Sequence, residues 1–173
     1  FLFKCFAIFL LHCWVQSSVA QSHSVLSRYT ITDKGWAQTE GGSGGKILKV
    51  TTLAASGPGS LLEALQTPGK RIIVFEVGGV IDLQGQYWKI KEPFLTIAGQ
   101  TAPDPGITLI KGELEIQTSD VIVQHLMFRP GEYGRPKRSG GDHDGLNTTN
   151  GAARIIVDHC SFSWATDENL SAS

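Results

Sequence analysis

Short apolar runs, each separated from the next by a turn, occupy most of the chain after residue 45. The runs are rich in Val, Ile and other β-branched residues, and Gly, Pro, Asp or Asn bounds each of them, as is typical of strands. No helical segments alternate with these runs, which argues against a doubly wound α/β fold and leaves a sandwich or a stack of coils. The predicted strands span residues 46–53, 71–77, 80–83, 89–90, 94–98, 107–110, 114–116, 121–128 and 154–162.

One short helix is predicted at residues 60–66. Ser60 is a good N-cap residue, and Glu63 stands at the capping-box position three residues later. Pro68 and Gly69 then stop the helix.

An internal repeat decides between the sandwich and the stack. Residues 121–128 (VIVQHLMF) match residues 155–162 (IIVDHCSF) at an offset of 34, with three aliphatic positions, the His and the Phe in common. Repeats spaced a few tens of residues apart are typical of solenoids. Equivalent residues of successive coils would then stack, His125 on His159 and Phe128 on Phe162. Coincidence between two ordinary strands is the competing explanation.

The first twenty residues have the order of a secretory signal peptide. Lys4 supplies a positive charge, an apolar run follows, and Ser18-Val19-Ala20 forms a small-x-small cleavage site. A transmembrane anchor is the alternative, but the run is shorter than the ~20 residues that a span needs. We therefore expect residues 1–20 to be a signal peptide, residues 21–173 to form one domain, and the mature protein to be extracellular and free of the membrane.

Composition excludes some classes of protein. The 173 residues include 20 Gly and 7 Pro, are 41% apolar, and carry a formal net charge of −1. This balance lacks the basic surface of a nucleic-acid binder, so no nucleic-acid partner is expected. Cys160 alone would remain after signal cleavage. Beside His159 it could be proposed as a nucleophile, but strand neighbours point to opposite faces, so Cys160 is interpreted as a small buried apolar residue.

Carboxylates gather around the last predicted strand. Asp142 and Asp144 precede it in Gly-Gly-Asp-His-Asp-Gly-Leu, and Asp167 and Glu168 follow it. Oxygen ligands of this kind suit a hard cation such as Ca²⁺. A solvated acidic loop is the alternative, because most exposed carboxylates bind nothing.

These motifs together resemble secreted pectate lyases of polysaccharide lyase family 1. The resemblance rests chiefly on residues 158–168 (DHCSFSWATDE) and on the Gly-Gly-Asp-(x)2-Gly-Leu segment, 140–146. Their order along the chain is more specific than any one of them. Earlier segments support it, namely 35–37 (GWA) with the glycine cluster 41–45, 52–65 (TLAASGPGSLLEAL), 73–81 (IVFEVGGVI), 96–103 (TIAGQTAP) and 128–131 (FRPG).

The resemblance implies an all-β fold, a right-handed parallel β-helix whose coils are capped by a short N-terminal helix. Residues 60–66 fit that helix, although Leu62 stands where the family would have an arginine. It also implies calcium-dependent cleavage of pectate, a polygalacturonate chain, by β-elimination to 4,5-unsaturated products. The calcium ligands carry over to Asp144 and Asp167, with Glu168 as a third. The catalytic base would be an arginine beyond Ser173, so the sequence is expected to be the N-terminal portion of a larger lyase that acts as a monomer.

Several further residues are open to more than one interpretation. Arg135, Lys137 and Arg138 could contact substrate carboxylates or could form an ordinary solvated loop. Asp158 is expected to hydrogen-bond a neighbouring coil rather than to bind the cation. Trp164 could stack on a sugar, but an aromatic residue at a strand end more often packs.

Two other functions remain open from the sequence. A hydrolase on the same solenoid would use paired carboxylates as acid and base, and would need no calcium. A non-catalytic, carbohydrate-binding solenoid is the second. An arginine at the matching downstream position would favour the lyase.

Overall fold

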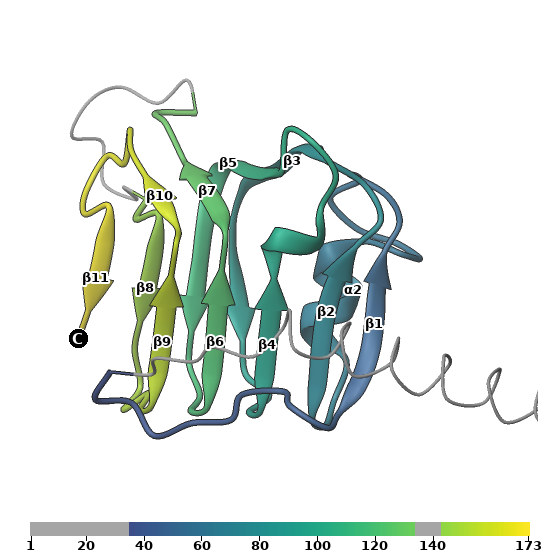
Figure 1. The fold of residues 1–173 in the computed structure, drawn as a ribbon. Coiled ribbons are helices and arrows are strands. Elements are labelled where there is room, and N and C mark those ends of the chain that lie inside the picture. Colours follow the sequence, from purple (N-terminus) through teal and green to yellow (C-terminus); the bar gives the residue numbers. More distant parts are fainter. Residues whose placement is uncertain (1–34, 134–142) are drawn as a thin grey trace, which may run out of the picture. The chain divides into compact units, whose positions relative to one another are not determined.

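The computed structural model describes residues 35–133 and 143–173, which form two parallel β-sheets with one short α-helix (Figure 1). The predicted signal peptide, Asp142 and the basic residues Arg135, Lys137 and Arg138 lie outside the described residues. No described helix has the length and hydropathy needed to span a membrane.

Five strands, all paired in parallel, make up the first sheet. Each strand pairs with the next one along the chain that returns to this sheet, so segments about 24 to 34 residues apart lie side by side. The predicted match at an offset of 34 is confirmed, because Val121 pairs with Ile155 and Val123 with Val157. The strands, in order across the sheet, are β1 (Lys46–Val50), β2 (Arg71–Phe75), β4 (Leu95–Ala98), β6 (Val121–Gln124) and β9 (Ile155–Asp158).

In the second sheet, the long strand β5 pairs with the short strands β7 and β8 along one edge and with β3 along the other. All of its pairings are also parallel. Its strands are β3 (Gly79–Ile90), β5 (Ile107–Ile116), β7 (Leu126–Arg129), β8 (Leu146–Thr148), β10 (Ser161–Phe162) and β11 (Leu170–Ala172).

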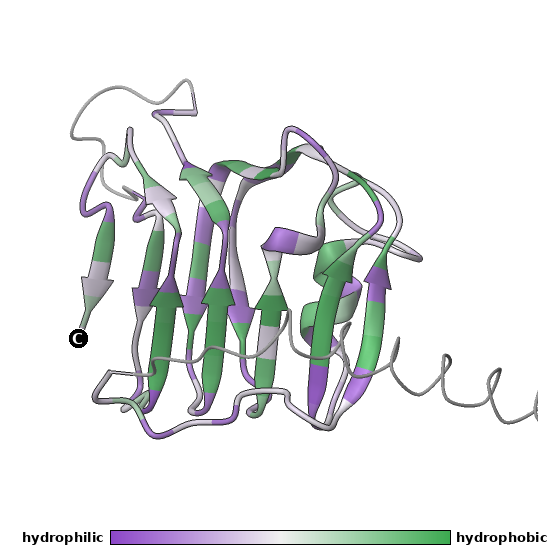
Figure 2. Ribbon diagram, viewed as in Figure 1, coloured by the Kyte–Doolittle hydropathy of each residue, from purple (hydrophilic) through white to green (hydrophobic). Residues whose placement is uncertain are grey.

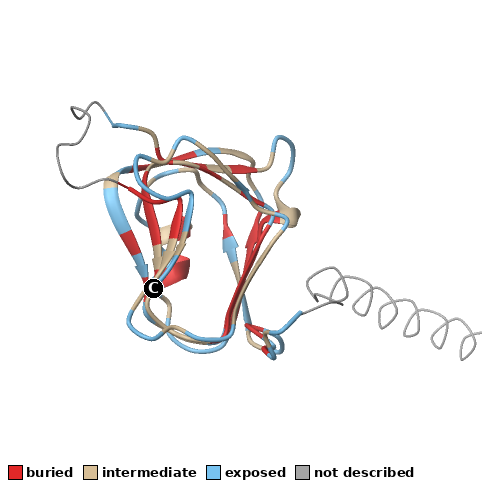
Figure 3. Cartoon of the chain, turned by 90° about the vertical axis from the view of Figure 1, so that its left-hand side faces the viewer, coloured by how far each residue is buried: buried red, intermediate tan, exposed pale blue. Residues whose placement is uncertain are grey.

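Rows of aliphatic side chains, one from each strand, form the core between the sheets. One row follows the register of the first sheet through Leu48, Ile73, Ile97, Val123 and Val157. The apolar bands run along the strands in Figure 2, and Figure 3 shows buried residues on the strands that face the interior. Full burial of such a side chain contributes about 1.5–3 kcal/mol, so these rows stabilise the stack.

The predicted helix is confirmed as α2 (Leu61–Gln66). The Ser60 hydroxyl accepts a hydrogen bond from the Glu63 amide at 3.2 Å, and the Glu63 carboxylate accepts one from the Gly59 amide at 2.7 Å. This arrangement closes the capping box one residue earlier than the standard pattern. Leu61 and Leu65 are buried against the core, so the helix covers the core beside β1 and β2.

Two of the strands predicted as continuous are each interrupted in the structure. Residues 121–128 divide into β6 and β7 at His125, and residues 154–162 divide into β9 and β10 at His159 and Cys160. Both histidines have a positive φ, 52° and 51°, so the chain turns a corner there and passes from one sheet to the other. The predicted stacking is nevertheless confirmed: the imidazole centroids lie 4.8 Å apart, and those of Phe128 and Phe162 lie 4.7 Å apart.

Further differences concern short elements. The sequence predicted neither β8 nor β11, each of three residues, nor the 3₁₀ turn η1 (Gly99–Thr101). The predicted pairs of strands 80–83 with 89–90 and 107–110 with 114–116 each form one longer strand, β3 and β5.

Candidate metal centre

The candidate cation ligands lie where the chain enters β8 and β11. These strands pair in register, Leu146 with Leu170, so Asp144 and Glu168 occupy equivalent positions just before them. The Glu168 amide donates to Asp144 Oδ1 at 2.9 Å, and the Gly145 amide donates to the Glu168 carbonyl at 3.2 Å. Backbone pairing therefore fixes the two segments side by side.

Asp144, Asp167 and Glu168 form one group of carboxylates. One oxygen from each lies within 4.8 Å of the others. Asp144 is only 6% exposed, whereas Asp167 and Glu168 face solvent. No lysine or arginine among the described residues forms an ion pair with any of the three.

The charges in this group act on one another. The charge of Asp167 is the largest cause that raises the pKa of Glu168 above its ordinary value, and Asp144 adds to the effect. Like charges held this close disfavour the ionised form, and a bound cation would remove that penalty. An all-oxygen set of carboxylates suits a hard divalent cation such as Ca²⁺.

Glu113 is a fourth carboxylate beside the group, and the sequence analysis did not identify it. It lies on β5, is 4% exposed, and its Oε2 accepts a hydrogen bond from the Asp144 amide at 3.1 Å. Burial is the main cause that raises the pKa of Glu113. Glu113 lies between the predicted strands 107–110 and 114–116, close to Lys111 and Glu115, so no signal in the sequence distinguished it from an ordinary exposed carboxylate.

A polar hollow of about 420 Å³ opens beside the carboxylates. Lys89 is the basic residue in the lining of this hollow, and its Nζ lies 3.3 Å from a Glu115 oxygen. Lys89, Glu115 and Asn147 follow one another in register across β3, β5 and β8, so the sheet presents them as a row. The lining residues are Tyr87, Lys89, Glu113, Glu115, Asp144, Asn147 and Asp167.

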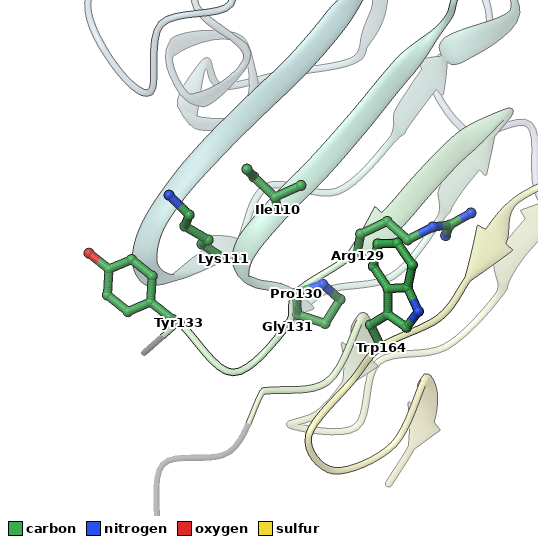
Figure 4. Close-up of a pocket in the computed structure, with 7 residues that line it drawn as sticks. All are labelled: Ile110, Lys111, Arg129, Pro130, Gly131, Tyr133 and Trp164. Carbon is green, nitrogen blue, oxygen red and sulfur yellow. The ribbon is translucent and has the colours of Figure 1, made fainter. Parts of the chain in front are cut away.

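A second hollow of about 550 Å³ lies at the end of β7 (Figure 4). Trp164, at its rim, is 74% exposed, so the expectation that this ring packs into the core is wrong. Arg129 is held by the main chain and side chain of Ser161, at 2.8 and 2.7 Å. Tyr133, also in the lining, immediately precedes the segment that contains Arg135, Lys137 and Arg138. The lining residues are Ile110, Lys111, Arg129, Pro130, Gly131, Tyr133 and Trp164.

Asp158 does not belong to the Asp144 group. Its Oδ2 accepts from Gln124 Nε2 at 3.2 Å, and its Oδ1 lies 2.7 Å from His159 Nδ1. The hydrogen bond to Gln124 on the paired strand β6 agrees with the hydrogen-bonding role expected for Asp158. Cys160, which was expected to be buried, is half-buried, and burial is the main cause that raises the pKa of its thiol.

Similar proteins carry this sequence pattern. A protein named probable pectate lyase C from Aspergillus flavus is 40% identical over 137 residues, which is 78% of this chain and 30% of that protein. The chain is homologous to part of these probable pectate lyases. Proteins of the same name from Emericella nidulans and Aspergillus terreus are 40% and 38% identical, over 79% of this chain and 31% of each protein.

The resemblance predicted from the sequence motifs is thus confirmed. The homologue spans about 30% of the length of the curated relatives that it matches. No protein-family model matches the chain.

Proposed function

We propose that this pectate lyase homologue forms part of a secreted, calcium-dependent lyase that cleaves pectate by β-elimination. The observation that carries the proposal is the group of Asp144, Asp167 and Glu168, gathered within 4.8 Å in a chain 40% identical to probable pectate lyases. The substrate would be the polygalacturonate chain, and the products would carry a 4,5 double bond.

The proposed fold is a right-handed parallel β-helix capped by α2, with residues 21–173 as part of a single lyase domain. Strands that return to the same parallel sheet, in register and with stacked His and Phe pairs, support it. Residues 1–20 are proposed as a signal peptide, which would place the mature protein outside the cell and away from the membrane. We propose that the complete enzyme is a monomer.

The proposed ligands of Ca²⁺ are Asp144, Asp167 and Glu168. Their fit rests on the raised pKa of Glu168 and on the lack of an ion-pair partner for these carboxylates in residues 35–133 and 143–173. When bound, Ca²⁺ neutralises a galacturonate carboxylate and makes the adjacent C5 proton more acidic. Glu113 acts as a positioning residue, because it accepts the Asp144 amide hydrogen and fixes that segment.

The chain also offers groups that would hold an acidic polymer. Lys89 lies in the polar hollow beside Asp144 and Asp167, where it could pair with a sugar carboxylate. Arg135, Lys137 and Arg138 are proposed to contact the substrate as well. Their place in the sequence, two residues and more after Tyr133 of the second hollow, supports this assignment. None of the described residues is proposed as the catalytic base, which we assign to an arginine outside this sequence.

The nature of the products tests this function. Polygalacturonate treated with the full-length protein and Ca²⁺ should release fragments that absorb in the ultraviolet and are lighter by one water molecule than hydrolysis products. New reducing ends with neither property would establish a hydrolase instead. Binding of polygalacturonate without any new ends would establish a non-catalytic binding protein.

A further inference from the structure

We propose that His125, Asp158 and His159 form a second cation site, selective for a divalent transition metal such as Zn²⁺. One potential ligand atom from each residue lies within 4.8 Å of the other two. The site lies at the corner where the chain leaves the first sheet, whereas the Asp144 group lies where it enters β8 and β11. It is independent of the proposed lyase function.

The backbone places the two imidazoles together. Gln124 pairs with Asp158 at the ends of β6 and β9. His125 directly follows Gln124, His159 directly follows Asp158, and both histidines have a positive φ. The left-handed corner directs both side chains outward, so both histidines are exposed. Their rings are nearly parallel, with centroids 4.8 Å apart and planes inclined by 10°.

Asp158 supplies an anionic oxygen between the two strands. Burial raises the pKa of this carboxyl, but hydrogen bonds from Gln124 and His159 outweigh burial, and the net pKa is lowered. Asp158 Oδ1 already lies 2.7 Å from His159 Nδ1 and Asp158 Oδ2 is held by Gln124, so the carboxylate is fixed.

A hydrogen-bonded ladder accounts for Gln124, Asp158 and His159 but not for His125. The His125 ring stacks on His159, and in the part of the chain that the structure describes its nitrogens make no hydrogen bond. A metal ion between the two rings would give the His125 nitrogens a partner and turn the stack into a binding site.

The donor set selects the type of metal. Imidazole nitrogens favour Zn²⁺, Cu²⁺ or Ni²⁺, whereas Ca²⁺ takes oxygen ligands. In a tetrahedral zinc site with bonds of about 2.0–2.2 Å, ligand atoms lie about 3.4 Å apart. The rings must therefore tilt toward each other, which exposed side chains can do. The bound ion would link β6 to β9 and stabilise the pairing of these strands.

Zinc titration of the untagged full-length protein tests the site. Isothermal titration should give one Zn²⁺ per chain, and the imidazole NMR signals of His125 and His159 should shift together. The melting temperature should rise with Zn²⁺, because an ion that binds only the folded state stabilises it. No saturable binding, or shifts confined to other histidines, would overturn the proposal.

Matched variants separate this site from the calcium group. His125→Asn and His159→Asn retain a residue that tolerates a positive φ, so each should fold while zinc affinity falls by about tenfold or more. Asp144→Asn should keep the zinc affinity. Equal zinc affinity in both histidine variants and the unaltered protein would contradict the assignment. Loss of lyase activity in any of these proteins would not bear on it, because the readout is metal binding.

Discussion

At the scale of single residues, the carboxylates near β8 differ in how they are held. Asp144 is buried and fixed by the Glu168 amide, whereas Asp167 is exposed. Glu113 is buried beside them. Substitution of Asp167 therefore tests how its charge contributes to cation binding, with the least disturbance of the fold.

We expect Asp167→Asn to raise the Ca²⁺ concentration needed for half-saturation by about tenfold, equivalent to roughly 1.4 kcal/mol of binding free energy. The amide keeps the shape of the side chain and removes one anionic ligand. The pKa of Glu168 should also fall toward its ordinary value, because the charge of Asp167 is the main cause of its elevation. Calcium titration calorimetry and NMR titration measure the two effects.

The matched control for Asp167→Asn is Glu76→Gln, which removes an exposed carboxylate that forms an ion pair with the exposed Lys49. Surface pairs of this kind contribute little to stability. If the control weakens calcium binding as much as Asp167→Asn does, the effect comes from overall charge and not from coordination.

Glu113→Gln should make the calcium-free protein more stable at neutral pH, by on the order of 1 kcal/mol. Burial raises the pKa of Glu113 in the folded state, so the folded protein binds this proton more tightly than the unfolded chain does. Stability is therefore lost as pH rises from the ordinary glutamate range through the raised pKa. The variant should lack this loss, and its advantage should vanish in acid.

Urea unfolding in chelator at several pH values measures this prediction. A constant difference between Glu113→Gln and the unaltered protein across pH would show that Glu113 does not titrate abnormally. Destabilisation at every pH would mean that the carboxylate is needed for its hydrogen bonds, chiefly that from the Asp144 amide.

The sequence indicated three of the four carboxylates but not Glu113. Asp144, Asp167 and Glu168 stand in motifs that resemble those of pectate lyases. Glu113 stands between the predicted strands 107–110 and 114–116, and only the pairing of β5 with β8 brings it to Asp144. Pairing of segments about 31 residues apart cannot be derived from local pattern.

At the scale of elements, α2 depends on a buried arginine in the neighbouring strand. Arg71 is fully buried on β2, and its guanidinium donates to the carbonyls of Ala64 and Leu65 at 3.3 and 2.8 Å. It also donates to Gly69, Glu92 and Pro93. The positive charge thus satisfies the carbonyls at the helix C-terminus, where the helix dipole favours a cation.

Arg71→Met should lower the free energy of unfolding by about 3 kcal/mol or more, because several buried carbonyls lose a charged donor at once. Lys70→Met is the matched control, since Lys70 is the exposed cation next to it. Chemical denaturation of both variants measures the effect. Equal stability of the two would show that water can replace the guanidinium.

Local pattern predicted the long elements and missed those that depend on a partner. The strands of the first sheet and α2 carry clear apolar runs or caps. In contrast, β8 and β11 have three residues each and are ordered by parallel pairing with β5 and with each other. The breaks at His125 and His159 were also missed, because a positive φ is uncommon for residues other than glycine in proteins generally, although several other residues here also have one.

At the scale of the whole molecule, the strands nearest Ser173 pair on one side only within the described residues, as β1 and β3 do at the other end. In Figure 1 the first sheet ends at β9 and the second at β10 and β11. Ile155 and Val157 are only half-buried, and Leu170 is 48% exposed. Such an edge is a template for pairing with another chain.

We expect residues 21–173, produced alone, to associate or to unfold without cooperativity, because the coils of the proposed β-helix would need a covered end. Sedimentation velocity and thermal unfolding measure this. A monomer with one sharp unfolding transition would count against the proposal that the last coil needs another part of the protein to cover it. The full-length protein provides the control and should be monomeric.

The most direct test of the proposed function is the calcium dependence of ultraviolet absorbance during polygalacturonate cleavage by the full-length protein. Absorbance should rise with added Ca²⁺, stop in excess chelator and resume when Ca²⁺ is restored, while circular dichroism stays unchanged. Asp144→Asn should need more Ca²⁺ for the same rate, because an anionic ligand has been removed. Full activity in excess chelator, or cleavage without absorbance, would contradict the assignment of a calcium-dependent lyase to these carboxylates.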